Sequence, residues 1–154
     1  MECYEGVKMI KTFRGILADG GQDRIRLATK KGKIGYKIHK FQLAGDAPGQ
    51  QSQESVVRLW KVKQSSVSTT AVDVDFSDGN MLAYGYAVDH DNPAYPMSQT
   101  VIFDQEIFNQ DVYITHTEMQ SARACNYYLE LEQVELSDNQ SSMATLQSLR
   151  QIAA

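Results

Sequence analysis

The segment Asn126-Tyr127-Tyr128-Leu129-Glu130-Leu131-Glu132-Gln133-Val134-Glu135-Leu136 is the clearest β-strand in the sequence. As far as Leu131 its apolar residues alternate with polar ones, which is the pattern of a strand with one face in a core. Val134 and Leu136 then occupy the opposite face, so the alternation changes phase near Glu132-Gln133. A β-bulge, or a strand that passes from one sheet to its partner, would explain this change. A second face in contact with a neighbouring element would explain it equally well.

Similar alternation upstream predicts an antiparallel β-hairpin. In Val72–Phe76 the apolar residues face one way and the carboxylates the other, and Met81–Val88 is a second alternating run. The turn residues Ser77 to Asn80 connect the two runs. The polar stretch from Ala44 to Ser55 predicts a longer loop. Further strands are expected at Met9–Leu17, Arg24–Thr29, Gly35–Leu43, Val56–Val62, Thr100–Phe103 and Val112–Thr117.

The end of the chain changes from strand alternation to helical spacing. This spacing predicts an amphipathic helix over residues 141–152, too short to be stable unless it packs on its own domain or on a partner. Its apolar stripe consists of Met143, Leu146, Leu149 and Ile152. We therefore expect a single domain over residues 1–154. The expected fold is all-β, an antiparallel β-sandwich or jelly-roll-like barrel with a short C-terminal helix.

Charge is divided sharply between the two halves of the chain. Residues 1–63 carry 13 Lys or Arg against 6 Asp or Glu, whereas residues 64–154 carry 2 against 13. The halves therefore have formal charges of +7 and −11, in agreement with the net charge of −4. Because surfaces of opposite sign attract, this division is expected to guide contact with identical subunits or with a larger assembly.

The sequence contains no motif for catalysis, so the chain is not expected to be an enzyme, and no cofactor is expected. It has no Gly-x-Ser-x-Gly elbow, Walker motif or paired-cysteine zinc pattern. Asp89-His90-Asp91-Asn92 lacks the ligand spacing of a calcium loop, so we interpret it as a solvated turn and expect no metal. Cys3 and Cys125 are interpreted as free thiols, with Cys125 buried at the start of a strand. The longest apolar run, Met81–Val88, is far shorter than the roughly 20 residues of a membrane-spanning helix, so no membrane partner is expected.

A basic cluster in the first half is the main candidate for partner binding. It surrounds a predicted hairpin and consists of Arg24, Arg26, Lys30, Lys31 and Lys33. The overall pI near 5.3 and the lack of a stacking-aromatic signature argue against nucleic acid as the partner. Contact with an acidic protein is favoured, and a simple solvated face is the alternative.

Tyrosines complete the candidate partner-binding set. Because Tyr127 and Tyr128 are adjacent, one ring faces the core and the other, assigned as Tyr128, is available to a partner. Tyr95 lies in a stiff loop between two prolines and is a candidate contact anchor, although it would equally well cover the edge of its own domain. Tyr86 is the other candidate. Tyr86 and Tyr95 are also the available platform for a sugar, so a carbohydrate-binding adhesion module is an alternative function.

The C-terminal half resembles small virion structural proteins encoded among the head genes of tailed bacteriophages. The resemblance covers about the last third of the chain and contains no catalytic signature; its segments are Val101–Asp104, Asn109–His116, Cys125–Glu132 and Ala144–Arg150. It implies a capsid cement or head-decoration protein: a non-enzymatic β-domain, often trimeric, that binds the outside of the assembled shell and reinforces it.

The implied partner is the major capsid protein or another virion protein, together with further copies of this chain in a symmetric oligomer, of which a trimer is favoured. The implied location is the capsid exterior after synthesis in the host cytoplasm. A head-to-tail adaptor, a tail component or a fibre-associated protein would have the same sequence features and is the alternative.

Overall fold

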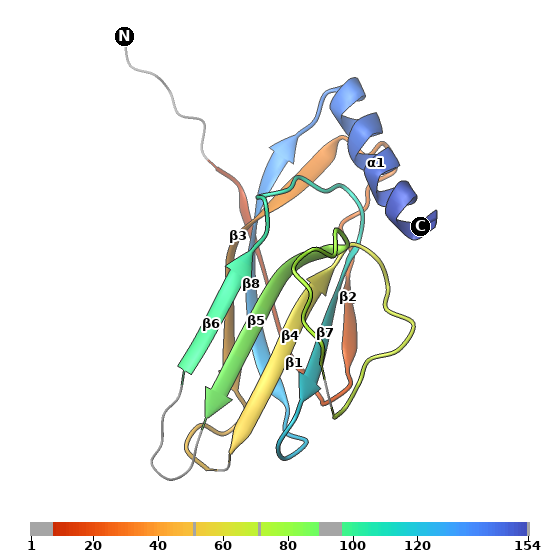
Figure 1. Cartoon of the computed structure of the whole chain (residues 1–154). Helices are drawn as coiled ribbons and strands as arrows, with labels where there is room; N and C mark the ends of the chain where they lie inside the picture. The colour runs from red at the N-terminus through yellow and green to blue at the C-terminus, as the bar shows by residue number, and fades with distance from the viewer. Residues whose placement is uncertain (1–7, 51, 71, 90–96, 154) are drawn as a thin grey trace.

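The computed structural model describes residues 8–50, 52–70, 72–89 and 97–153. Two antiparallel sheets pack face to face, and a helix lies at the end of the molecule where β3 begins and β8 ends (Figure 1). None of the described helical residues form a segment long and apolar enough to cross a membrane. The elements are β1 (Ile10–Leu17), β2 (Gln22–Ile25), β3 (Ile34–Gly45), β4 (Gln53–Trp60), β5 (Met81–Asp89), β6 (Met97–Ile102), β7 (Val112–Glu118), β8 (Cys125–Glu135) and α1 (Asp138–Ala153).

The strand order is that of a jelly roll. One sheet has the order β1-β8-β3, and the other has the order β2-β7-β4-β5-β6. Thus β1 pairs with β8, β2 with β7 and β4 with β5, as in an antiparallel ribbon that is folded at its centre and rolled up. The remaining pair of such a ribbon, β3 and β6, lies close together, but β6 is hydrogen-bonded to β5. We refer to the line along which β3 and β6 lie close together without being paired as the β3–β6 seam. The predicted antiparallel sandwich with a short C-terminal helix is confirmed.

Apolar side chains fill the space between the sheets because the inner face of each central strand is aliphatic or aromatic. Leu129 and Leu131 of β8 have no exposed surface and belong to one buried cluster with Leu59 and Ile114 of the facing sheet. The sheets also approach closely beside Gly85 of β5, where a Cβ atom would come within 2.5 Å of the side chain of Leu43. A larger residue at this position would therefore push the two sheets apart.

β8 pairs continuously with β1 on one side and with β3 on the other. The phase change near Glu132-Gln133 is therefore neither a bulge in β8 nor a passage to the other sheet. The irregularity lies in the neighbouring strand, where the pairing of β3 shifts between Ile38 and Lys40. Leu136 follows the end of β8 and is buried beside Ile107. The apolar residues on the opposite face thus point toward a neighbouring segment.

The predicted strand Val72–Phe76 is wrong. These residues are irregular backbone within the connection of residues 61–80, so β5 pairs with β4 and β6 and the predicted hairpin does not form. Phe76 packs edge-on against the rings of Tyr84 and Phe103, with ring centres 5.4 Å and 4.8 Å away. An extended segment that lies on a sheet alternates in the same way as a strand, which explains the error. We refer to residues 61–80 as the cover segment.

The cover segment crosses the outer face of the five-stranded sheet and is held there by hydrogen bonds. The hydroxyl of Thr117 donates to the carbonyl oxygen of Ser68 at 2.8 Å, and the side-chain amide of Gln22 donates to the carbonyl oxygen of Gln64 at 3.0 Å. Residues that face outward from this sheet are consequently as buried as core residues, namely Val56, Trp60, Leu82, Thr115 and Thr117. The outer face of the five-stranded sheet is therefore covered over β7, β4 and the beginning of β5, whereas β6 stays exposed or half-buried.

Several boundaries also differ from the sequence prediction; for example, the strand predicted at Arg24–Thr29 is β2 at Gln22–Ile25. β4 begins at Gln53, inside the stretch predicted as a loop, and α1 extends from Asp138 rather than from residue 141. α1 packs through small residues, because the described side chains that it buries are Ser141, Ala144 and Ser148. Met143 and Leu146 of the predicted apolar stripe are 62% and 52% exposed, so this part of the stripe does not pack on its own domain. The side chains of Leu149 and Ile152 lie outside the described part of the structure.

The buried amide of Asn109 explains why small residues line this contact. Its Nδ2 donates to the carbonyl oxygen of Gly32 at 2.9 Å and to the hydroxyl oxygen of Thr145 at 2.9 Å, and the carbonyl oxygen of Ser141 is 3.3 Å away. A single side chain thus connects the β2–β3 connection to the first turns of α1. The helix lies close to that connection, and only small side chains fit between them.

We expect Asn109→Ala to lower the free energy of unfolding by about 2 kcal/mol, because it leaves buried acceptors without a donor. The helix should also detach more often, so the substitution should accelerate amide hydrogen exchange in residues 141–148 more than in the strands. Urea denaturation and hydrogen exchange measure the two effects. Asn139→Ala, an exposed change on the same helix, is the matched control. Equal effects of the two substitutions would contradict the role of Asn109.

Candidate functional site

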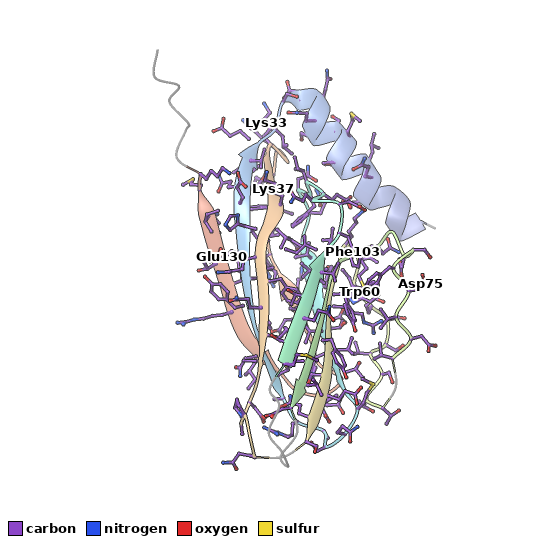
Figure 2. All side chains as sticks on the ribbon, turned by 60° about the vertical axis from the view of Figure 1, so that its left-hand side comes forward. Lys33, Lys37, Trp60, Asp75, Phe103 and Glu130 are labelled. Atoms are coloured by element: carbon purple, nitrogen blue, oxygen red, sulfur yellow. The ribbon has the colours of Figure 1, made fainter. Side chains whose placement is uncertain are left out.

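The outer face of the three-stranded sheet is uncovered in the described part of the chain, in contrast to the outer face of the other sheet. Residues opposite one another in antiparallel strands share a face, so the strand register defines its members. Figure 2 shows Lys37 and Glu130 on this sheet, away from Trp60 and Asp75. We refer to this surface as the open face; it consists of Ile10, Thr12, Arg14, Ile16, Lys37, Lys40, Gln42, Ala44, Asn126, Tyr128, Glu130 and Glu132.

Charges of opposite sign lie side by side on the open face. Nζ of Lys37 is 3.5 Å from Oε2 of Glu132, and Nε2 of His39 is 3.8 Å from Oε2 of Glu130. The hydroxyl of Tyr128 donates to Oε1 of Glu130 at 2.7 Å, and this bond raises the pKa of Tyr128. The carboxylates of β8 are therefore shared between a basic neighbour and an aromatic one.

The β1 side of the open face is apolar and cationic. Ile10 and Ile16 are 38% and 56% exposed, and Arg14 lies opposite Tyr128 in the register. β1 is an edge strand of its sheet, so its backbone groups on the side away from β8 face no strand of that sheet. Exposed aliphatic side chains beside arginine and tyrosine are the composition of protein–protein contacts.

Residues of the two oppositely charged halves of the sequence form ion pairs with each other within the chain. Six ion pairs in the described structure each join a residue before position 64 to a residue after it. They are Arg24–Asp111, Lys33–Asp138, Lys37–Glu132, His39–Glu130, Lys61–Glu106 and Asp46–Arg123, the histidine pair requiring a protonated ring. The rolled ribbon explains this pattern, because it places strands of the first half beside strands of the second half.

The predicted basic cluster is divided by these contacts. Nε of Arg24 lies 2.7 Å from Oδ2 of Asp111, whose other oxygen accepts backbone N–H groups. Burial favours the neutral form of Asp111, but those bonds and Arg24 outweigh it and lower the pKa of the carboxyl. Lys33 pairs with Asp138 at the start of α1 at 2.9 Å. Arg24 and Lys33 stay more than half exposed in these pairs, and the cluster members for which the described structure shows no ion pair are Arg26, Lys30 and Lys31.

The predicted tyrosines do not form one site. Tyr128 is on the open face, whereas Tyr86 lies on the outer side of the other sheet, where its hydroxyl donates to Oε1 of Glu54 at 2.8 Å. Burial and this bond raise the pKa of Tyr86 to about 12, so the ring is held in place rather than presented as a flat platform. Tyr95 and His90 lie outside the described residues.

A polar network occupies the interior at the end of the sandwich opposite α1. Nδ1 of His116 lies 3.0 Å from the carbonyl oxygen of Leu17, so Nδ1 carries the proton and Nε2 accepts from the hydroxyl of Ser55 at 2.9 Å. The same hydroxyl oxygen accepts from Nε2 of Gln53 at 2.9 Å. Ser55 and His116 have no exposed surface, so this Ser–His pair connects three strands and is closed to a substrate in this structure.

Cys125 lies beside this network. It is buried, free of a disulfide and the first residue of β8, as the sequence predicts, whereas Cys3 lies outside the described residues. Burial raises the pKa of its thiol to about 11, which leaves little reactive thiolate at neutral pH. Among the described residues, no group of three or more His, Cys, Asp or Glu side chains is arranged to hold a metal ion.

A cleft of about 180 Å³ opens at the β3–β6 seam, at the same end of the molecule as this network. We refer to it as the seam cleft; its lining consists of Leu43, Ala44, Gly45, Pro48, Gln53, Ala87, Val88, Asp89, Met97 and Ser98. Gln53 and Asp89 lie opposite one another on β4 and β5 and are 1% and 6% exposed. Oε1 of Gln53 and Oδ1 of Asp89 accept no hydrogen bond in the described structure.

The buried polar residues escape prediction from the sequence. Gln53 and Ser55 lie at the end of a run of Gln and Ser, where polar residues indicate a loop rather than an inner strand face. Asp89 belongs to a stretch that was interpreted as a solvated turn. The available signal is spacing, because Gln53, Ser55 and Val57 alternate in phase with the core of β4.

The comparisons with known proteins give no family. No protein-family model matches the chain, and no curated protein matches it. A solved structure described by the words "Bacillus endospore appendages form a novel family of disulfide-linked pili" is similar at 17% identity, over 89% of this chain and 97% of that chain, with a TM-score of 0.28. A TM-score this low supports no conclusion about this chain.

The buried imidazole of His116 makes stability depend on pH. Burial lowers its pKa, and the carbonyl groups of Ala18 and Leu17 oppose this effect only in part. The unfolded chain binds a proton near the ordinary value of about 6.5, before the native chain does, so stability that is complete above that value is lost as the pH falls toward the native pKa. We therefore expect the urea concentration at the midpoint of unfolding to decrease as the pH is lowered from about 7 to about 5.

His116→Gln should reduce this fall, because it removes the buried imidazole. If His116→Gln does not fold, an NMR titration of the parent protein gives the pKa of the ring directly. A native His116 pKa at or above about 6.5 would contradict the argument.

Proposed function

We propose that this chain is a non-enzymatic virion structural protein that binds and stabilises a phage capsid shell, as a cement or decoration protein in a symmetric oligomer. The observation that supports this most is the contrast between the two outer faces. The cover segment buries much of the outer face of one sheet, whereas the described chain leaves the open face of the other sheet uncovered. The second support is the resemblance of the last third of the sequence to phage head proteins.

The composition of the open face is suitable for a protein partner. Exposed Ile10 and Ile16 supply apolar area, and Arg14 and Tyr128 are residue types enriched at protein interfaces. Jelly-roll sandwiches occur in viral capsid proteins and in lectins, so the fold agrees with the proposal but does not select it by itself. The rigid sheet loses little conformational entropy when a partner docks.

The internal ion pairs limit how strongly charge contributes to binding. Arg24 and Lys33 already have acidic partners within the chain, so attraction to an acidic shell depends on the exposed cations that remain. These include Arg14 and Lys40 on the open face and Lys30 and Lys31 in the β2–β3 connection. Contacts between exposed charges weaken as salt increases, so binding should be tighter at low ionic strength.

Purified protein should bind capsids of the phage that encodes it when those capsids lack it, and should raise the temperature at which they lose DNA. Arg14→Glu should weaken binding about tenfold or more, because it places an acidic group on the β1 side of the open face, opposite Tyr128. Co-sedimentation at low salt measures binding, and dye access to the DNA during heating measures the stabilisation of the shell.

Lys63→Glu is the matched control, since it makes the same charge change at an exposed residue of the cover segment. It should bind like the parent chain. A double variant, Lys30→Glu with Lys31→Glu, tests the predicted basic cluster separately from the open face. If the parent protein does not bind capsids at low salt, the proposed function is wrong. If the control weakens binding as much as Arg14→Glu, the open face is not the binding surface.

A further inference from the structure

The seam cleft combines apolar walls with two buried oxygen atoms that lack hydrogen-bond donors. Leu43, Pro48 and Met97 contribute to its walls, and Gln53 and Asp89 are paired across neighbouring strands. Buried polar atoms normally have partners, and an unpaired one costs about 1 to 3 kcal/mol. Two unpaired acceptors at opposite positions in one cleft therefore indicate a group that supplies donors there.

The hydrogen bonds of the remaining atoms fix Oε1 of Gln53 as an acceptor and leave Oδ1 of Asp89 as the second unpaired oxygen. Nε2 of Gln53 donates to the carbonyl oxygen of Ala124 and to the hydroxyl oxygen of Ser55, each at 2.9 Å. Because a carbonyl oxygen can only accept, the amide of Gln53 has a fixed orientation and Oε1 cannot exchange places with Nε2. Oδ2 of Asp89 accepts the backbone N–H of Gly49 at 2.6 Å, which leaves Oδ1 as the unpaired carboxylate oxygen.

Gly45 makes room for this arrangement. A Cβ atom at this position would lie 2.5 Å from Oε1 of Gln53, so any side chain there would push the amide away. The absence of a side chain thus preserves a pair of acceptors that the fold itself does not satisfy.

We propose that the seam cleft binds a primary alkylammonium group. Its N–H groups would donate to Oε1 of Gln53 and Oδ1 of Asp89, and its positive charge would balance the buried carboxylate. Its aliphatic chain would lie between Leu43, Pro48 and Met97. The ligand is either a free aliphatic amine or the side chain of a lysine from another protein molecule, since both carry this group.

Other occupants fit these observations less well. One water molecule accounts for roughly 30 Å³, so it would leave most of a cleft of about 180 Å³ empty and apolar. An anion would be repelled by Asp89. A calcium ion needs about 6 to 8 oxygen ligands, whereas the described lining offers the side-chain oxygens of one carboxylate, one amide and one hydroxyl.

Titration with n-butylammonium chloride at neutral pH, followed by calorimetry and by NMR, tests the proposal. Butylammonium should bind and shift the amide signals of Gly49 and Ser98. Butanol lacks the charge and tetramethylammonium lacks N–H donors, so each should bind at least about tenfold more weakly. Asp89→Asn should weaken butylammonium binding by a similar factor, whereas Asp104→Asn, at an exposed carboxylate outside the cleft lining, should not.

If Asp89→Asn does not fold, contacts observed by NMR between the methyl group of butylammonium and Met97 or Leu43 in the parent protein decide the question. Equal binding of butanol and butylammonium, or binding that is unchanged by Asp89→Asn, would overturn the proposal. No binding of butylammonium would overturn it as well.

Sedimentation distinguishes the two sources of the amine. If a lysine of a second copy of this chain occupies the cleft, the protein should self-associate, and excess butylammonium but not tetramethylammonium should separate the copies. If the source is a free amine, butylammonium should bind without changing the sedimentation. This inference does not depend on the proposed capsid role, because the amine and capsid experiments can fail independently.

Discussion

β8 is hydrogen-bonded along its length to β1 on one side and to β3 on the other, and the remaining structure depends on this insertion. The inner residues of β8, such as Leu129 and Leu131, form the centre of the core. Its outer residues, such as Tyr128 and Glu130, form the middle of the open face. The alternation of β8 thus places one set of its residues in the core between the sheets and the other set on the open face.

The same insertion explains where the charges of the two halves meet. Because the rolled ribbon pairs early strands with late ones, cations of the first half lie beside carboxylates of the second. Exposed ion pairs of this kind each contribute little to stability, so their main effect is on register and on the field outside the protein. Each ion pair within the chain partly neutralises two charges that could otherwise attract a partner.

Much of the fold follows from the sequence because alternation reports which residues face an apolar environment. It predicted the sandwich and the positions of most strands, and it placed Cys125 correctly as a buried residue. Alternation does not report what lies on the apolar side. For this reason Val72–Phe76, which lies against the outside of a sheet, was predicted as a strand of a hairpin.

The helix and the seam cleft show two further limits of sequence patterns. Met143 belongs to the apolar stripe of α1, yet it is exposed, whereas the helix contacts its own domain through small residues such as Ser141 and Ala144. Gln53 and Asp89 are buried although they are polar, since their surroundings come from strands that are distant in sequence. Only the arrangement of those strands in space places the two oxygens in one cleft.

The insertion of β8 also has a consequence for synthesis on the ribosome. β1 is made first and β8 last among the described strands, so β1 has no hydrogen-bonded neighbour in its sheet until residues 125–132 have emerged. Contacts between distant segments form slowly because a long loop must close first. A nascent chain of this protein must therefore keep β1 from aggregating until β8 has been made, and the lysines and arginines of residues 1–63 keep it charged meanwhile.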